Sequence, residues 1–418
     1  MNEIFLGLDL CATNMQISFC KGDSIEPESI YQLNNTETYL LPNTMYFSTD
    51  ENKWYVGSEV SRIKFSHNGK LVDDVVGNVG TTNQLIINGV TYNYEDLLLI
   101  LLKTQIEEFM AGMPDSSLVA LTVTVEHYNK NIFEVLNKLK SELGIKDDKF
   151  CILSHENAFF QYIMNQDESV RSNSISMFEF DTEGMYYYRM DRKKLNSTVV
   201  YSLTKTKLDE IDYSMVFGDL EQLDELFAKV ALKKMRETYI SSVFLTGTGF
   251  KDKWIKKSQN VLCDGRRVFI GQNIYTKGAC YHAKHGAFEK GRDIVLNTNG
   301  FIAYDIGVRI GDQSGKTKFY PITLGGREWY NMKGTVILFL DDTNRVEIIY
   351  RNRITDDTQK EVVEIHGLPK RPPKTTKLSI EVELYDEKNG AIIIRDMGFG
   401  KIYPTTNKIY RKEISWAE

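Results

Sequence analysis

The chain has 418 residues, of which 42% are hydrophobic and 26% charged, with a formal net charge of -6. Its length exceeds what one hydrophobic core usually serves, so we expect two or three domains. The composition is typical of a packed globular protein and excludes a fibrous or largely disordered chain. The mildly acidic balance excludes a broad basic surface, so we expect no nucleic-acid partner.

The cysteines and the apolar runs bear on the compartment. The five cysteines are scattered, with no CxxC pair, as is typical of proteins from a reducing compartment. No run approaches the roughly 18 apolar residues of a membrane helix, and the first residues lack the basic flank of a signal peptide. We therefore expect a cytoplasmic protein with no membrane partner.

A β-hairpin opens a first α/β lobe, predicted over residues 1–165. Ile4 to Leu10 and Met15 to Cys20 read as strands, and the polar turn between them follows Asp9. The rest of this lobe alternates between strand and helix patterns. The predicted strands are Thr44 to Ser48, Leu118 to Val125 and Cys151 to Leu153, and the predicted helices are Tyr94 to Met110, Asn129 to Leu143 and Glu156 to Met164.

The same unit then begins again in a second lobe, predicted over residues 166–292. The strand Ile175 to Phe180 ends at Asp181, and a second strand, Tyr186 to Met190, follows Gly184. An aspartate at a hairpin turn thus occurs twice, which predicts two similar lobes. A helix at Leu220 to Glu237, a strand at Val243 to Thr246 that runs into glycines, and a helix at Ile274 to His285 complete the second lobe.

From about residue 293 to residue 418 the helical periodicity disappears. Short strands separated by turn clusters predict a β-sandwich. The prolines between residues 369 and 373 cannot pair in a ladder and predict a loop. The predicted strands are Ile302 to Ile310, Thr317 to Thr323, Thr335 to Leu340, Arg345 to Tyr350, Glu361 to His366, Leu378 to Tyr385 and Ala391 to Arg395.

The two aspartate hairpins and the late strand ending in glycines resemble the two phosphate loops and the adenosine loop of the actin and seventy-kilodalton heat-shock chaperone superfamily. The segments 365–369, 378–382 and 389–393 resemble late strands of the peptide-binding β-domain of that chaperone family. Residues 293–296 fall where the family has its interdomain linker. The resemblance covers nearly the whole chain and implies two ribonuclease-H-like lobes, the actin-like ATPase fold, followed by a β-sandwich.

The resemblance also implies a site between the lobes. Asp9 and Asp181 match the aspartates with which the family holds magnesium and catalyses ATP hydrolysis. The residues that match its nucleotide-binding loops are Thr13, Asn14, Gly184, Gly247, Thr248 and Gly249. A different interpretation is that each aspartate merely occupies a polar turn, where aspartate is common.

Several residues depart from the family pattern at this site. Cys11 stands where the family has a glycine, and Glu183, Met185 and Tyr186 occupy a loop that is glycine-rich in the family. A carboxylate near 4 Å from a phosphate costs on the order of 4 kcal/mol at an effective dielectric of about 20. His155 or Glu156 takes the place of the catalytic-site glutamate of the family.

Two parts of the family architecture are also expected to be absent. Too few residues separate the Tyr186 strand from the Leu220 helix to form the subdomain that covers adenine in the chaperones. The sequence stops at Glu418, soon after the sandwich strands, so we expect no helical lid. We therefore expect the nucleotide site to be degenerate and no cofactor to be bound. Mg-ATP or Mg-ADP would be the ligand if the site is retained.

Three functions remain open at this point. The first is a chaperone-like protein without efficient ATP cycling, which binds a protein or an extended peptide through its β-sandwich. The second is a weak Mg-ATP-dependent chaperone ATPase that uses Asp9 and Asp181. The third is a kinase-like enzyme of the same fold, although such enzymes do not end in this β-sandwich. The sequence does not indicate an oligomeric state.

Overall fold

A computed structural model describes residues 2–30, 39–251, 254–288, 292–311, 316–341 and 343–416. The protein is a mixed α/β protein, as predicted. Its contacts divide it into two compact units, which are described separately. The first contains Met1–Arg189 and Lys205–Lys290, and the second contains Met190–Thr204 and Gly291–Glu418. No helix in the described part of the chain is both long and apolar enough to cross a membrane.

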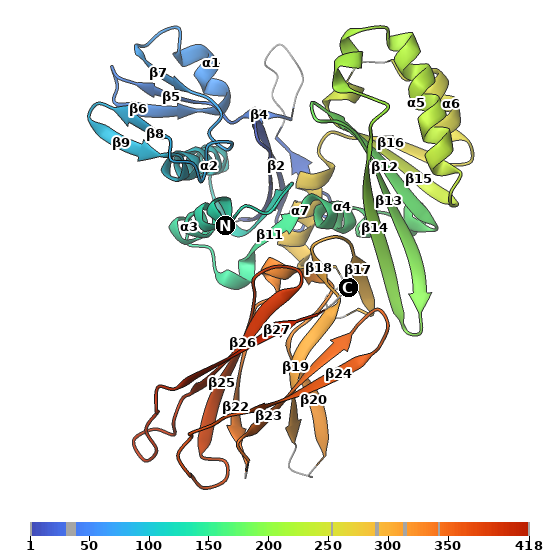
Figure 1. Cartoon of the computed structure of the whole chain (residues 1–418). Helices are drawn as coiled ribbons and strands as arrows, with labels where there is room; N and C mark the ends of the chain where they lie inside the picture. The colour runs from blue at the N-terminus through green and yellow to red at the C-terminus, as the bar shows by residue number, and fades with distance from the viewer. Residues whose placement is uncertain are drawn as a thin grey trace. The chain divides into compact units, whose positions relative to one another are not determined.

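A six-stranded sheet organises the amino-terminal part of the first unit (Figure 1). Its order is β11-β10-β1-β2-β3, and β4 also pairs with β2. The predicted hairpin is confirmed, because β1 runs antiparallel to β2 and parallel to β10. The strands are β1 (Asn2–Leu10), β2 (Asn14–Lys21), β3 (Glu28–Ser29), β4 (Leu41–Pro42), β10 (Ser116–Val125) and β11 (Phe150–Ser154).

Successive side chains of β1 point to opposite faces of the sheet, and each face packs against different helices. Ile4, Leu6 and Leu8 belong to a buried core that also contains the apolar side chains of α2 (Tyr94–Ala111) and α3 (Lys130–Glu142). The other face carries Gly7 and Asp9, and it packs on α7 (Ile274–His285). One sheet face therefore closes the core, and the opposite face carries the first aspartate of the predicted site.

Between β4 and α2, the chain forms a small region that the sequence predicted only at Thr44 to Ser48. Two short antiparallel sheets, β6-β5-β7 and β8-β9, lie there with helix α1. Asn93 caps α2 by accepting a hydrogen bond from the backbone N–H of Asp96. The elements are β5 (Met45–Ser48), β6 (Lys53–Val56), α1 (Val60–Ile63), β7 (Gly69–Val72), β8 (Gln84–Ile87) and β9 (Val90–Asn93).

The second six-stranded sheet has the order β16-β15-β12-β13-β14-β17. Its first five strands repeat the order of the first sheet, because β12 lies beside β13 and runs parallel to β15, which runs parallel to β16. The strands are β12 (Ser174–Asp181), β13 (Gly184–Leu195), β14 (Thr198–Leu208), β15 (Ile240–Thr246), β16 (Arg267–Ile270) and β17 (Ile294–Asn297).

One face of this sheet packs on α5 (Leu220–Met235) and α6 (Lys257–Cys263), with Phe178 and Phe227 among the buried contacts. The segment expected to be an interdomain linker forms β17 instead. It pairs in parallel with residues 199–202 of β14 inside the second unit.

Helices α4 (His155–Met164) and α7 lie side by side at the centre of the first unit (Figure 1). Close packing here depends on glycine. A methyl group on Gly7 would lie 2.3 Å from the carbonyl oxygen of Thr276, and one on Gly278 would lie 1.8 Å from that of Ala158. The hydroxyl of Thr276 donates to the carbonyl of Gly7 at 3.0 Å. Helix α7 is thereby fixed against both β1 and α4.

The second unit contains two four-stranded antiparallel sheets, β20-β19-β23-β24 and β22-β25-β26-β27, around one apolar core. Each predicted strand overlaps an observed one, and one has identical bounds at Thr317–Thr323, but the predicted strand Ile302 to Ile310 is split into β18 and β19, which lie in different sheets. The sequence missed β27. The strands are β18 (Phe301–Ile302), β19 (Tyr304–Gly311), β20 (Thr317–Thr323), β21 (Arg327–Glu328), β22 (Gly334–Leu340), β23 (Arg345–Asn352), β24 (Thr358–Glu364), β25 (Thr376–Leu384), β26 (Asn389–Asp396) and β27 (Ile409–Ser415).

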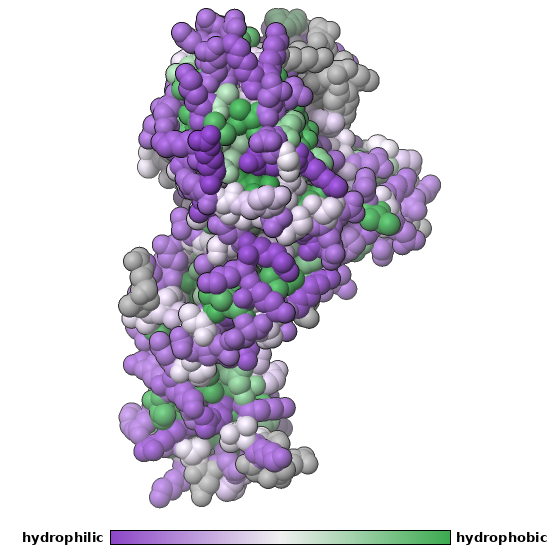
Figure 2. Space-filling model, turned by 90° about the vertical axis from the view of Figure 1, so that its right-hand side faces the viewer, coloured by the Kyte–Doolittle hydropathy of each residue, from purple (hydrophilic) through white to green (hydrophobic). Residues whose placement is uncertain are grey.

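The surface carries no broad apolar band on the face drawn in Figure 2, where hydrophobic residues form small patches between hydrophilic ones. Some large apolar side chains of the second unit are nevertheless exposed. Ile337 and Phe339 point outward from the edge strand β22, with 53% and 49% of their surface exposed. Phe339 contacts the ring of Phe399.

Candidate functional site

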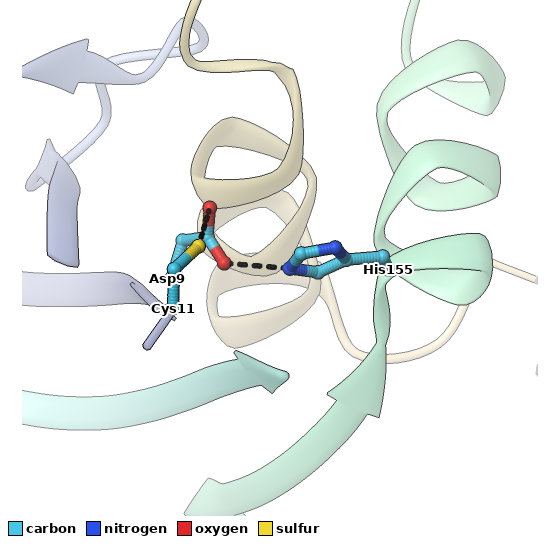
Figure 3. A group of neighbouring side chains, drawn as sticks. All are labelled: Asp9, Cys11 and His155. Carbon is cyan, nitrogen blue, oxygen red and sulfur yellow. Dashed lines mark hydrogen bonds and ion pairs between the residues drawn. The ribbon is translucent and has the colours of Figure 1, made fainter. Parts of the chain in front are cut away.

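A buried contact between Asp9 and His155 lies at the centre of the candidate site (Figure 3). Asp9 is the penultimate residue of β1, and His155 is the first residue of α4. The Nε2 atom of His155 lies 2.8 Å from the Oδ1 atom of Asp9, and both side chains are at most 5% exposed. Asp9, the first predicted aspartate, is therefore paired with His155 of the same protein.

The position of the His155 ring is fixed from two sides. Ser154 caps α4 by accepting a hydrogen bond from the N–H of Asn157, which places His155 at the start of the helix. The imidazole also stacks on the ring of Tyr275 from α7, with 4.0 Å between centroids and 9° between planes. Burial opposes protonation of the ring, but the charge and the hydrogen bond of Asp9 raise the pKa of His155 to about 9.

Cys11 lies on the other side of the Asp9 carboxylate, with its Sγ atom 3.8 Å from Oδ2 of Asp9. The N–H of Cys11 donates to the carbonyl of Asn14, which closes the turn between β1 and β2. The Asn43 amide donates to the carbonyl of Cys11 at 2.7 Å and holds this turn from outside. The predicted nucleotide ligand Thr13 is exposed at the tip of the turn, and the Asn14 amide donates to its hydroxyl.

Asp181, the second predicted aspartate, is also hydrogen-bonded to a residue of the protein itself. The Oδ1 atom of Asp181 accepts hydrogen bonds from the N–H and the hydroxyl of Thr248, at 2.8 and 2.6 Å. Burial raises the pKa of Asp181, although the bonds from Thr248 oppose the shift. The structure thus brings Asp181 and Thr248 together, and this contact ties the β12–β13 turn to the loop after β15.

The predicted glycines support this loop contact. Gly247 has φ 99°, and a methyl group there would lie 2.4 Å from the carbonyl oxygen of Phe180. Gly249 packs on the Phe180 ring, where a methyl group would lie 2.3 Å from a ring atom. Gly184 opens β13 with φ 109°. The space beside these glycines was predicted to admit phosphate. It is instead filled by Phe180 and Asp181.

A further set of charged and phenolic side chains lies near His155, on which Glu179 and Glu126 act. The hydroxyl of Tyr188 donates to Glu179 at 2.7 Å, and Lys205 forms an ion pair with Glu126 at 3.2 Å. Burial raises the pKa of Glu179 despite the nearby positive charges of His155 and Lys205. Burial lowers the pKa of Lys205, but the charges of Glu179 and Glu126 outweigh this effect and raise it.

Several carboxylates act on the thiol of Cys11. Burial raises the pKa of the Cys11 thiol well above its ordinary value, and the charges of Asp9, Glu126, Glu179 and Asp181 raise it further. The cations that act on these carboxylates include His155, Lys205, His127 beside Glu126 and Lys251 beside Asp181. Such a field favours a bound cation and disfavours a polyphosphate.

Sequence reasoning identified both aspartates but missed the side chains that pair with them. His155 was considered only as a replacement for a catalytic glutamate, and Thr248 only as a nucleotide ligand. Glu179, Tyr188 and Tyr275 carried no local signal beyond their strand or helix pattern, and Lys205 lies in β14, which the sequence did not predict. Only the expectation that two aspartate hairpins face a common site could have directed attention to the start of α4.

Comparisons with known proteins identify a family and a further domain. Residues 26–298 match the C-terminal model of a family of unknown function, DUF5716, and residues 302–416 match a domain of unknown function, DUF8552. The first match covers more than half of the chain, so the protein belongs to the DUF5716 family. A search of curated proteins found no match. The first matched segment ends just after β17, and the second begins at residue 302, the last residue of β18.

Proposed function

We propose that this protein is a divergent relative of the seventy-kilodalton heat-shock chaperones that does not cycle ATP and serves as a protein- or peptide-binding module. The repeated strand order of the two six-stranded sheets supports an actin-like arrangement of two lobes. An aspartate lies at the end of the first hairpin strand in each sheet, since Asp9 is the penultimate residue of β1 and Asp181 is the last residue of β12. On this proposal, the lobes are a retained scaffold.

The observation that carries the proposal is that internal partners bind both aspartates. His155 pairs with Asp9, and Thr248 donates twice to Asp181. Magnesium binds through carboxylate oxygens and retained waters and needs these oxygens free. Removing the partners would leave the buried carboxylate of Asp9 and the partly buried carboxylate of Asp181 without a partner, which costs free energy. Glu126 and Glu179 add negative charge beside the space that phosphates would need.

Calorimetry of Mg-ATP and Mg-ADP binding to the purified chain tests this proposal. We expect no specific heat at millimolar nucleotide. Specific binding that is lost in both Asp9→Ala and Asp181→Ala would contradict the proposal and favour the weak chaperone ATPase. Circular dichroism of both variants separates a lost site from a lost fold.

The binding surface that we propose is the free edge of β22. Ile337 and Phe339 expose apolar side chains on this edge strand, and an extended peptide adds to such an edge by backbone pairing while its side chains contact apolar neighbours. We expect a labelled leucine-rich peptide to bind the full chain. Lys substitutions at Ile337 and Phe339 should weaken binding at least about tenfold, which corresponds to about 1.4 kcal/mol.

The matched control for this surface is Val362→Lys. Val362 is also exposed, but it lies on β24, at the edge of the other sheet of the sandwich. Binding that weakens equally in the control, or that survives both β22 substitutions, would argue against the β22 edge.

A further inference from the structure

We propose that Asp9, Cys11 and His155 form a binding site for a borderline transition-metal ion, of which Zn²⁺ is the expected occupant. The Asp9 carboxylate, the Cys11 thiol and the His155 imidazole each offer one ligand atom, and these atoms all lie within 4.8 Å of one another (Figure 3). The Nε2 atom of His155 lies 2.8 Å from Oδ1 of Asp9, and the Sγ atom of Cys11 lies 3.8 Å from the other carboxylate oxygen, Oδ2.

These separations suit one central ion. Zinc binds imidazole nitrogen and carboxylate oxygen at about 2.0 to 2.2 Å and thiolate sulfur at about 2.3 Å, so ligands in a tetrahedral arrangement lie roughly 3.3 to 3.6 Å apart. The ligand atoms all lie within 4.8 Å of one another, so movements of up to about 1 Å would bring them to that geometry. The ion would take the place of the proton that His155 shares with Asp9, and three protein ligands would leave one position for water.

The donor set selects against magnesium. Mg²⁺ is a hard ion that requires oxygen ligands, whereas a mixed set of nitrogen, sulfur and oxygen suits zinc and other borderline ions. His155 and Cys11 both stand where the heat-shock family, to which the sequence bears a resemblance, has other residues. The same two side chains that obstruct a magnesium nucleotide at Asp9 are therefore good ligands for zinc.

Unpartnered buried oxygens provide a second, independent observation. Gln16 and Thr124 lie directly opposite Asp9 on the two neighbouring strands, so their side chains share its face of the sheet. Both are buried, at 7% and 0% exposure. Among the residues that the structure describes, Oε1 of Gln16 and Oγ1 of Thr124 have no hydrogen-bond partner. Buried acceptors are rarely left unpaired, and a metal-bound water beside Asp9 would supply the donor.

The site would also gain from the surrounding charge. Asp9, Glu126, Glu179 and Asp181 all act on Cys11, and a divalent cation would offset part of this negative charge. This inference goes beyond the proposed function and does not depend on it, since peptide binding by the sandwich requires no metal.

Cobalt(II) binding to the reduced full-length protein tests the site, because Co²⁺ replaces Zn²⁺ and is coloured. We expect one Co²⁺ per chain, a thiolate-to-cobalt charge-transfer band and visible bands typical of four-coordinate cobalt. Zn²⁺ should remove these bands and Mg²⁺ should not. Equilibrium dialysis with Zn²⁺ alone should give the same stoichiometry.

The decisive variant is Cys11→Ser, which removes the thiolate at a partly exposed position. It should abolish the charge-transfer band and lower affinity at least about 100-fold, since even outer partners of metal ligands cost 10- to 100-fold. Cys263→Ser, at an exposed cysteine, is the matched control and should retain both. The proposal is overturned if the wild type shows no stoichiometric band, or if the band survives in Cys11→Ser. Nucleotide calorimetry is independent of both results.

Discussion

The carbonyl oxygen of Ala158 in α4 lies directly against Gly278 in α7. A methyl group added to Gly278 would lie 1.8 Å from this oxygen, far inside any contact that a side chain tolerates. The two helices therefore approach at a distance that only glycine permits. Since α4 begins at His155 and α7 contains Tyr275, this approach also positions the imidazole and the ring on which it stacks.

Substitution of Gly278 by alanine should separate these helices. We expect Gly278→Ala to lower the free energy of unfolding by at least about 3 kcal/mol, at the upper end of overpacking costs, or to prevent folding. Gly271→Ala is the control, because its added methyl would meet nothing closer than 3.6 Å. Urea unfolding followed by circular dichroism compares the two variants. Equal stability would show that α4 and α7 can move apart without cost.

The buried pair of Asp9 and His155 should contribute strongly to the free energy of unfolding, and this contribution should require both side chains. We expect His155→Ala to cost about 3 to 5 kcal/mol of unfolding free energy, because Asp9 then remains buried without its partner. The loss should be smaller in an Asp9→Asn background. Measurements in the presence of a chelator exclude a contribution from metal.

An exposed ion pair provides the comparison for this prediction. Lys103 and Glu142 are separated by 2.8 Å, but their side chains are 36% and 41% exposed, so Lys103→Ala should lower the free energy of unfolding far less than His155→Ala. Similar losses in His155→Ala and Lys103→Ala, or strict additivity of the Asp9 and His155 changes, would refute a buried ion pair.

The hydroxyl of Thr248 should be needed for the loop contact in the second lobe. It donates to Asp181 at 2.6 Å and lies 3.0 Å from the hydroxyl of Tyr213. We expect Thr248→Val to cost about 1 to 3 kcal/mol, because Asp181 loses one of its two donors while partly buried. Thr248→Ser retains the hydroxyl and should recover most of that loss. If serine is no better than valine, the methyl group and not the hydrogen bond stabilises the loop.

The sandwich should lose stability in acid through Asp396. Burial opposes ionisation of this carboxyl, but bonds from Arg371 and from the N–H groups of Gly398 and Thr406 hold the pKa of Asp396 well below its usual range. Because the folded-state pKa is depressed, this contribution is complete above the unfolded pKa of about 3.9 and is lost as the pH falls below it. Stability of the second unit should therefore decrease steadily below about pH 4.

Asp396→Asn should reduce stability at pH 7 and flatten this acid dependence, since Arg371 and Asp396 are 2% and 0% exposed and form two hydrogen bonds. Glu413→Gln changes an exposed pair with Arg411 and should alter neither quantity measurably. Urea titrations between pH 2 and pH 7 provide both comparisons. If stability depends on pH in the same way in Asp396→Asn, the loss of stability in acid arises from other carboxyl groups.

Local patterns in the sequence predicted most elements, because strand alternation and helix caps act over a few residues. Helix Ile274–His285 was predicted with identical bounds. Strand β27 was missed because its pattern, Ile-Tyr-Arg-Lys-Glu-Ile-Ser, is largely polar and follows a run of turn residues. The small sheets of residues 45–93 were mostly missed because their strands have only four residues each.

The site could be predicted only in part. Asp9 and Asp181 were found through the repeated hairpin, which is a local signal. The partner of Asp9 lies 146 residues away, and no periodicity encodes a side-chain contact over that separation. Likewise, Thr248 was expected to face a ligand, and its contact with Asp181 became visible only with the β12–β15 pairing in place.

Helix α7 has a consequence for how the protein is made. The first sheet is built from residues before 155, yet the face of β1 with Gly7 is covered by residues 274–285. During synthesis, that face stays open until α7 has left the ribosome, by which time the strands of the second sheet up to β16 have already emerged. The first sheet is thus translated before the second sheet but stays open on one face until most of the second sheet has been made, and this open face must avoid wrong associations in the meantime.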